Sequence, residues 1–299
     1  MERAKVNGVE LEYEVRGSGE PVLLISPVVA GAFVPFLSAP PLVDRYRLIR
    51  YHKRGWGEST HTAHTTPPVR IADHAADATA LLEHLGVSRA HVAGHSSGGS
   101  IALQLAFERP DLVYTLALLE PSLFSVPSAQ ALLERAAPSV EAYHSGDHEG
   151  AVVGFLSLVS GLDRETCRGV IQENVPGSIA QAISDADTLF GVELPAVGAW
   201  EFGRDEAAVI TQPVLSVLGT ETETLWVEVA GLLRSWFPQV EELAVDGVGH
   251  LLQMQRPEPV ARGLASFLSR YPMSSVENGK SHARARAVIG APLSGAVGA

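Results

Sequence analysis

A serine between glycines is the first feature of this sequence that could do chemistry. Residues 94–99 read Gly-His-Ser-Ser-Gly-Gly, after an apolar run at 90–93 and before helical spacing over 100–109. A strand, a tight turn and a helix in this order place the Ser96 hydroxyl at the crest of the turn. The N–H of Ser97, at the start of the helix, then points toward the place where negative charge would develop. The pattern therefore predicts that Ser96 is a nucleophile.

A histidine late in the chain supplies the base that such a serine needs. A serine hydroxyl is a poor nucleophile at neutral pH unless a base takes its proton. His250 follows the predicted strand 240–245 in a glycine-rich loop, at the same sheet edge as the serine turn. We therefore expect His250 to take the proton of Ser96 and to return it to the leaving oxygen. His95 is adjacent to Ser96, where side chains diverge, so it is expected to line the pocket instead.

Charge and composition restrict the partners of the protein. The 299 residues carry a formal net charge of −12, which argues against binding to nucleic acid or to an anionic membrane surface. The one cysteine, Cys167, fits a reducing compartment, and the first residues contain no apolar stretch of a signal peptide. A cytoplasmic protein is therefore expected. Because no carboxylate or thiol completes a metal site with His61 and His64, no metal and no cofactor is expected.

Apolar segments alternate with amphipathic segments along most of the chain. Such alternation predicts an α/β protein with a mostly parallel central sheet and helices on both faces. An Asn-Gly turn at residues 7 and 8 precedes alternating apolar residues, which predicts a hairpin at one edge of the sheet. The other predicted strands are 22–25, 46–51, 90–93, 115–120, 213–219 and 240–245, and the clearest helices are 73–85 and 257–270.

The alternation stops after residue 120. Residues 121–211 have helical character and leave the sheet at the edge where Ser96 is expected. We therefore predict a helical cap over the site, inserted into a core of residues 1–120 and 212–272. Residues 273–299 lack apolar periodicity and are expected to form a disordered tail. Prolines are expected to interrupt the helical pattern of the cap at positions 127, 138, 176 and 195.

Four motifs in order resemble those of the α/β-hydrolase fold superfamily, over roughly residues 5–271. The first is the Arg-Gly-x-Gly-x-Ser loop at 54–59, and the second is the serine turn. The third is the strand 213–219, which in this family precedes the usual acid, and the fourth is Gly-His at 249–250 before a helix. The resemblance implies an α/β-hydrolase fold with a Ser-His-acid triad and no cofactor. It does not name a substrate, because this fold hosts many reactions.

The acid departs from the arrangement that is common in this superfamily. Many members place an Asp three residues after the glycine that ends the next-to-last core strand. Counted from Gly219, that position holds Thr222, which cannot carry a charge. Glu221 and Glu223 flank it, and neither is in register. Both glutamates stay open as alternatives for the third member of the triad.

A second acid position is used by some members, at the end of the strand that follows the serine turn. Here that position holds Glu120, and zearalenone-type lactonases look similar at this point. The resemblance therefore implies that Glu120 holds the tautomer of His250 and stabilises its charged form. The following residue, Pro121, is expected to restrict Glu120 to an extended conformation.

The oxyanion hole also departs from the family pattern. The family often has His-Gly after the third strand, whereas this chain has Ser26-Pro27-Val28. Because Pro27 has no N–H, the N–H of Val28 is expected to act beside that of Ser97. The residues expected to contact substrate are His95, Val29, Phe155, Trp200 and Leu251.

Together these features predict a serine hydrolase that cleaves a carboxylic ester or lactone through an acyl-Ser96 intermediate. The apolar cap indicates a hydrophobic small molecule as the partner, with no nucleic acid and no membrane. An acyltransferase or lactone-forming enzyme of the same fold is an alternative. A ligand-binding protein without activity on the same scaffold is another. The sequence leaves association into a homodimer open.

Overall fold

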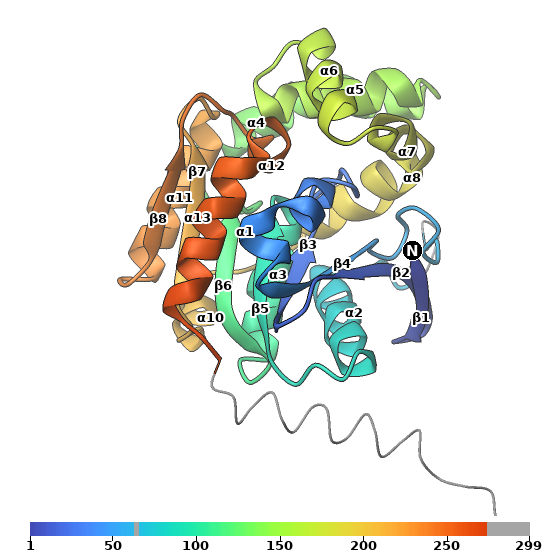
Figure 1. Ribbon diagram of the computed structural model, residues 1–299. Helices are drawn as coiled ribbons and strands as arrows, with labels where there is room; N and C mark the ends of the chain where they lie inside the picture. The colour runs from blue at the N-terminus through green and yellow to red at the C-terminus, as the bar shows by residue number, and fades with distance from the viewer. Residues whose placement is uncertain (63–65, 274–299) are drawn as a thin grey trace, which may run out of the picture.

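The computed structural model describes residues 1–62 and 66–273, and in these ranges the chain folds around one eight-stranded sheet (Figure 1). The strand order is β1-β2-β4-β3-β5-β6-β7-β8. All neighbouring strands from β4 to β8 pair in parallel, which confirms the predicted α/β class. The bounds are β1 Glu2–Val6, β2 Val9–Arg16, β3 Glu20–Ile25, β4 Tyr46–Tyr51, β5 Ala90–His95, β6 Val113–Leu119, β7 Val214–Gly219 and β8 Glu241–Val245.

The N-terminal hairpin forms one edge of this sheet, as predicted. Strands β1 and β2 pair antiparallel, and β2 also pairs antiparallel with β4. The connecting turn places Asn7 at φ 47° and Gly8 at φ 76°. Two consecutive positive φ values are those of the turn type that Asn-Gly favours, because its twist matches that of the two strands.

The two faces of the sheet carry separate hydrophobic cores. Along β3, Leu23 and Ile25 contribute to one core, whereas Val22 and Leu24 contribute to the other, as the alternation of side chains in a strand requires. The first core is covered by α2 (Ile71–His84), α3 (Ser97–Glu108) and α11 (Thr224–Trp236). The second is covered by α13 (Pro257–Arg270) together with two short helices, η1 (Val34–Ser38) and α1 (Pro40–Val43).

A group of helices lies between β6 and β7 and covers one edge of the sheet (Figure 1). We call its helices α4 to α9 the cap. The last helix of the segment, α10, packs instead on α3 and α11, although it lies within the range predicted as cap. The bounds are α4 Ala129–His144, α5 His148–Ser160, α6 Arg164–Asn174, α7 Ser178–Ser184, α8 Ala186–Thr188, η2 Leu189–Glu193, α9 Leu194–Gly198 and α10 Arg204–Val209.

Two of the four prolines do not interrupt a helix, so that part of the prediction is wrong. Pro138 lies inside α4, and Pro195 lies in the first turn of α9. The first turn of a helix tolerates proline because its N–H has no partner there. Pro138 is exposed, so water can satisfy the carbonyl oxygen that loses its hydrogen bond.

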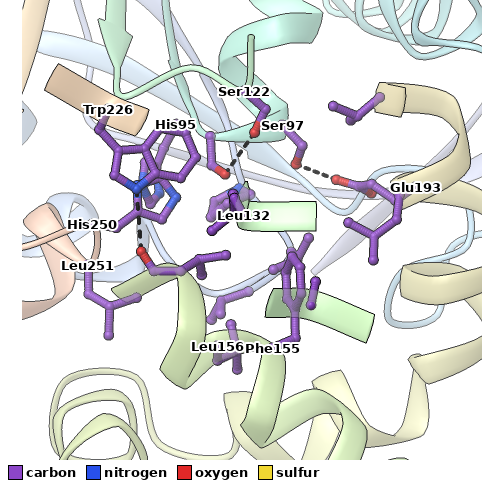
Figure 2. Close-up of a pocket in the computed structure, with 18 of the residues that line it drawn as sticks. His95, Ser97, Ser122, Leu132, Phe155, Leu156, Glu193, Trp226, His250 and Leu251 are labelled. Atoms are coloured by element: carbon purple, nitrogen blue, oxygen red, sulfur yellow. Dashed lines mark hydrogen bonds between the residues drawn. The ribbon is translucent and has the colours of Figure 1, made fainter. Parts of the chain in front are cut away.

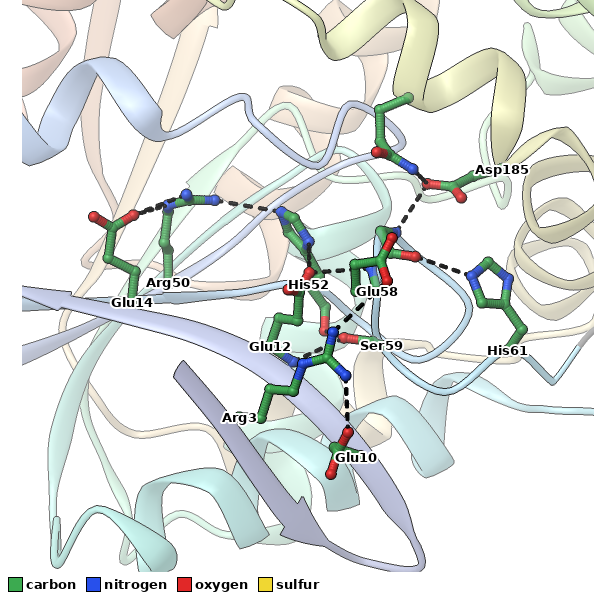
Figure 3. A network of polar contacts seen from close by, with 12 residues as sticks. Arg3, Glu10, Glu12, Glu14, Arg50, His52, Glu58, Ser59, His61 and Asp185 are labelled. Atoms are coloured by element: carbon green, nitrogen blue, oxygen red, sulfur yellow. Dashed lines mark hydrogen bonds and ion pairs between the residues drawn. The ribbon is translucent and has the colours of Figure 1, made fainter. Parts of the chain in front are cut away.

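The Arg-Gly-x-Gly-x-Ser loop is fastened to the hairpin and to the cap by polar contacts (Figure 3). The Glu12 carboxylate accepts from the N–H of Glu58 at 3.0 Å and contacts His52 Nδ1 at 3.0 Å. From the cap, the Asp185 carboxylate accepts from the N–H of Gly57 at 2.9 Å. The loop is therefore a fixed platform between β2 and the cap.

The structure describes only the first residue of the C-terminal segment that was predicted as a tail. Met273 is buried, and its N–H donates to the Glu20 carboxylate at 2.7 Å. The rest of the tail predicted over 273–299 lies outside the described residues, as does His64. Within 1–62 and 66–273, none of the helices has both the length and the apolar character that a membrane span requires.

Candidate active site

Ser96 lies on the turn between β5 and α3 in a conformation that few residues adopt. Its φ is 53° and its ψ is −122°, a region that is sparsely populated for residues with a side chain. A Cβ on Gly94 would lie against the carbonyl oxygen of Gly98, and a Cβ on Gly98 against that of Ile25. Glycine is therefore required on both sides of the serine, and the strained turn presents the Ser96 side chain to the pocket.

Glu120 follows β6 directly and also has a positive φ, of 42°. The expectation that Pro121 keeps it extended is therefore wrong. The N–H of Glu120 donates to Val217 on β7, so the sheet holds the backbone while the chain turns back. After the turn, the N–H of Ser122 donates to the carbonyl oxygen of Ser96 at 3.0 Å. Backbone hydrogen bonds on either side of the turn thus fix Glu120 relative to Ser96.

The loop after β8 brings His250 to Glu120. His250 Nδ1 lies 2.6 Å from Glu120 Oε2, and both side chains are buried. The carboxylate also accepts from the N–H of Gly219 at 2.9 Å and from the hydroxyl of Thr222 at 3.1 Å. Thr222 therefore supports the Glu120 carboxylate. With Nδ1 donating to the carboxylate, Nε2 of His250 keeps its lone pair for a proton.

The two alternative acids lie elsewhere. Glu221 is exposed, and no contact between it and His250 is found in the described part of the chain. Glu223 pairs with Arg135 of α4 at 3.0 Å. Among the three glutamates considered, Glu120 is the one that the fold brings to His250.

Burial determines the charge of both groups. The ring of His250 lies flat against Trp226, with centroids 3.8 Å apart and planes inclined by 4°, and His95 lies 4.6 Å away. Burial lowers the pKa of His250 to about 3, so the ring is neutral and can accept a proton. Burial raises the pKa of Glu120 to about 8, although the hydrogen bonds from Gly219 and the following loop act in the opposite direction.

The raised pKa of Glu120 predicts a pH profile whose acid limb has its midpoint near pH 8. A protonated Glu120 lacks the charge that would stabilise a charged His250, so kcat/KM is expected to fall roughly tenfold per unit as the pH drops below about 8. The lowered pKa of His250 alone would leave the profile flat at these pH values. Measuring kcat/KM from about pH 5 to about pH 10 separates the two cases. A flat profile over this range would show that Glu120 is already ionised.

Ser96 is hydrogen-bonded to a neighbour that the sequence did not indicate. Its hydroxyl lies 3.2 Å from that of Ser122, which is labelled in Figure 2. The carbonyl oxygen of Ser122 accepts from the Ser100 hydroxyl at 2.7 Å, which fixes this loop on α3. A rotation about the Cα–Cβ bond redirects the Ser96 hydroxyl, and such contacts tighten when substrate binds.

The site opens into an apolar pocket between the sheet edge and the cap. Its volume is about 170 Å³. Phe155 and Leu156 of α5 line the pocket opposite Ser122 and Ser97 (Figure 2). The polar groups around it are few, chiefly those of the serines, histidines and Glu193. The other lining residues are Pro27, Val28, Val29, His95, Ser96, Ser97, Ser122, Phe124, Leu132, Leu133, Ala136, Val140, Val159, Glu193, Leu194, Val197, Leu251 and Met254.

Most residues expected to line the pocket are there, and Trp200 is not. His95, Val29, Phe155 and Leu251 border this pocket. Trp200 contacts Phe202, and its Nε1 donates to Gln104 at 2.7 Å, beside a separate hollow. The reason is that the chain after α9 leaves the cap and returns to the core helices.

The two residues expected to supply the oxyanion donors, Val28 and Ser97, both line the pocket. Ser97 is the first residue of α3, so its N–H has no acceptor within the helix. Val28 follows Pro27 in the loop after β3, and both residues line the pocket. An oxygen bound near Ser96 could therefore meet two backbone N–H groups. Clusters of three or more His, Cys, Asp or Glu that could hold a metal are absent from the described ranges.

Three residues around the site were missed by the sequence prediction. Trp226 belongs to the buried stripe of α11 with Val229 and Leu233, at the helical spacing that could have revealed it. Glu193 is a single charge within an apolar run, which is a signal for a buried polar role. No sequence pattern indicated Ser122, because its contact with Ser96 depends on the turn of the chain at Glu120.

A serine on a strand–helix turn, with a histidine and an acid at the same sheet edge, is the arrangement of the α/β-hydrolase fold. The sequence model of the alpha/beta hydrolase fold family matches residues 21–257, and the chain belongs to this family. A curated relative, a putative carbamate hydrolase RutD of Azorhizobium caulinodans, is 34% identical over 119 residues. That match covers 40% of this chain and 44% of the relative, so the chain spans less than half the length of this relative.

Two solved structures share the fold over most of the chain. The N-acyl homoserine lactone degrading enzyme Est816 is 27% identical, with a TM-score of 0.67, and the match covers 89% of this chain and 100% of that chain. A thermophilic esterase from Thermogutta terrifontis is 22% identical, with a TM-score of 0.76, over 91% of this chain and 100% of that one.

Proposed function

We propose that the protein hydrolyses carboxylic esters or lactones of hydrophobic small molecules through an acyl-Ser96 intermediate. The observation that carries this proposal is the position of Ser96 on a strained turn at the pocket, at the same edge as the buried His250–Glu120 pair. The similarity to an esterase and to a lactone-degrading enzyme is consistent with this chemistry.

The proposal gives each residue of the site a role. His250 Nε2 takes the proton as Ser96 Oγ attacks the carbonyl carbon, and the carbonyl oxygen becomes an oxyanion facing the N–H groups of Ser97 and Val28. Glu120 stabilises the charged His250. The oxyanion collapses, the bond to the leaving oxygen breaks, and His250 gives the proton to that oxygen. Water then attacks the acyl-Ser96 ester in the same way and regenerates the hydroxyl.

The size and lining of the pocket favour a compact apolar acyl group. A cavity of about 170 Å³ is close to one that accepts a benzene-sized ligand. Phe155, Leu132 and Met254 offer no hydrogen bonds to a polar acyl group, and an apolar group gains from contact with them. A large macrocyclic lactone exceeds this space, so a compact ester or a small lactone is the better candidate.

A panel of esters tests this proposal. We expect kcat/KM to rise from acetate to butyrate and benzoate esters, by about tenfold for each methylene pair that becomes buried, and to fall for macrocyclic lactones. The matched variant Phe155→Ala enlarges the pocket and should move the optimum to longer acyl groups. Equal kcat/KM for acetate, benzoate and macrocyclic substrates would contradict the proposed pocket. No turnover of any of them would contradict the proposed activity.

A further inference from the structure

A buried ion pair joins the cap to the chain just after β4. Lys53 lies in the loop after β4, and Glu193 ends the π-helical turn η2 of the cap. The ammonium group contacts Glu193 Oε1, and the two side chains are only 2% and 1% exposed. Taking two charges out of water offsets much of what such a pair contributes to stability. Short π-helical turns such as η2 are frequent at functional sites.

The same carboxylate holds the residue next to Ser96. The hydroxyl of Ser97 donates to Glu193 Oε1, as the right-hand dashed line in Figure 2 shows. Trp56 Nε1 donates to Glu193 Oε2 at 2.7 Å, and Lys53 Nζ also lies 3.4 Å from the Ser97 hydroxyl. The carboxylate therefore receives three donors, and all of them belong to the core rather than to the cap.

The charges around Glu193 leave Lys53 as its counterion. Arg54 is engaged by Asp77, with both of its contacts at 2.6 Å. His74 lies in the same buried region, and burial lowers its pKa to about 4, so it is neutral near pH 7. Lys53 lowers the pKa of Glu193 against the effect of burial. The carboxylate therefore stays charged, and a charged acceptor binds a hydroxyl more strongly than a neutral one.

We propose that Glu193 is a positioning residue for the oxyanion hole. Held by Lys53, it fixes the Ser97 side chain and thereby orients the Ser97 N–H toward the oxyanion. Because Glu193 belongs to the cap, the hole is complete only while η2 rests on the core. The inference rests on the proposed function, since an oxyanion forms only if Ser96 attacks a carbonyl group. Contact of η2 with the core therefore controls the chemical step as well as the entry of substrate.

Two single variants and their combination test this role. Glu193→Gln keeps the shape and removes the charge, whereas Ser97→Ala keeps the backbone N–H and removes the hydroxyl. We expect each to lower kcat about tenfold with KM changed less than about twofold, because the donor is displaced rather than lost. Since both substitutions remove the same contact, the kcat of the double variant should lie within about twofold of the kcat of the less active single variant.

A transition-state analogue separates positioning from general loosening. An aryl boronic acid forms a tetrahedral adduct with a reactive serine, so its affinity should fall about tenfold in both single variants, in parallel with kcat. An unreactive amide analogue of the ester should bind all variants within about twofold of the wild type. Circular dichroism and the Tm report whether each variant is folded.

Thr188→Val is the matched control. Its hydroxyl donates to the carbonyl oxygen of Gly55 at 2.6 Å, so this variant removes another buried bond between the cap and the same loop, without touching Ser97. We expect kcat within about twofold of the wild type. An equal loss of kcat in Thr188→Val would reduce Glu193 to a general cap contact and overturn the proposal.

The remaining outcomes are also decisive. Wild-type kcat in Glu193→Gln, a change confined to KM, or losses that multiply in the double variant would each overturn the proposal. If Glu193→Gln does not fold, Ser97→Ala carries the test, because it leaves the ion pair with Lys53 in place. Wild-type kcat and boronate affinity in Ser97→Ala would then overturn the inference. If the wild-type protein hydrolyses no ester, the proposed function itself is contradicted.

Discussion

Ser96→Ala is expected to lower kcat by roughly 10³-fold or more while the protein stays folded. The substitution removes Oγ, the atom that would bond to the acyl group, and keeps Cβ. The backbone strain at φ 53° is therefore the same in both proteins, and the Tm should change little. The measurement is kcat on the best ester of the panel, together with the Tm of each protein.

Ser122→Ala is the matched comparison for that experiment. Ser122 has the hydroxyl that lies 3.2 Å from Ser96 Oγ, but its own backbone is not on the glycine-flanked turn. We expect a loss of less than about tenfold, the effect of one neutral hydrogen bond. Near-normal turnover in Ser96→Ala with a large loss in Ser122→Ala would assign the nucleophile to Ser122 instead.

Glu120→Gln is expected to lower kcat by about 10²- to 10⁴-fold. The amide removes the charge that would stabilise the protonated His250. The amide also has one oxygen in place of the two carboxylate oxygens, one of which accepts from the N–H of Gly219 and the other of which contacts His250 Nδ1. If that oxygen turns to Gly219, the amide NH2 faces Nδ1 of His250 and favours the wrong tautomer. The pH profile of this variant should lose the limb near pH 8 that the raised pKa of Glu120 predicts.

The other two glutamates provide the controls. Glu221→Gln and Glu223→Gln should each lower kcat less than about tenfold, because Glu221 is exposed, Glu223 is partly exposed, and carboxylates near the surface contribute little. For Glu223 the loss is limited to its pairing with Arg135 on the surface of α4. All three variants are compared on one substrate. A severe loss of kcat in Glu221→Gln or Glu223→Gln, with normal kcat in Glu120→Gln, would move the acid from the end of β6 to the loop after β7.

The features that the sequence predicts well are those with local causes. The glycines at 94 and 98 are required by close contacts within the turn and with the end of β3. The hairpin at Asn7 depends on two adjacent residues. The strands alternate with helices at spacings set by the backbone, which is why the sheet and the place of Ser96 could be predicted.

The features that could not be predicted depend on contacts between distant segments. Lys53 and Glu193 are 140 positions apart, and their contact exists only after the cap has packed on the loop. The positive φ of Glu120 results from bonds to β7 and to the serine turn, which outweigh the local preference set by Pro121. Trp200 lies in the range predicted as cap, yet its ring contacts Phe202 and its Nε1 donates to Gln104 of the core helix α3.

The most direct test of the account is the site of labelling by a fluorophosphonate, which forms a bond rapidly only with an activated serine. After incubation with the probe, the intact protein is weighed by mass spectrometry and its peptides are sequenced. The account predicts one adduct per chain, on Ser96, with none on Ser96→Ala and slower labelling of Glu120→Gln. No adduct under conditions that label a known serine hydrolase, or an adduct on a residue other than Ser96, would contradict it.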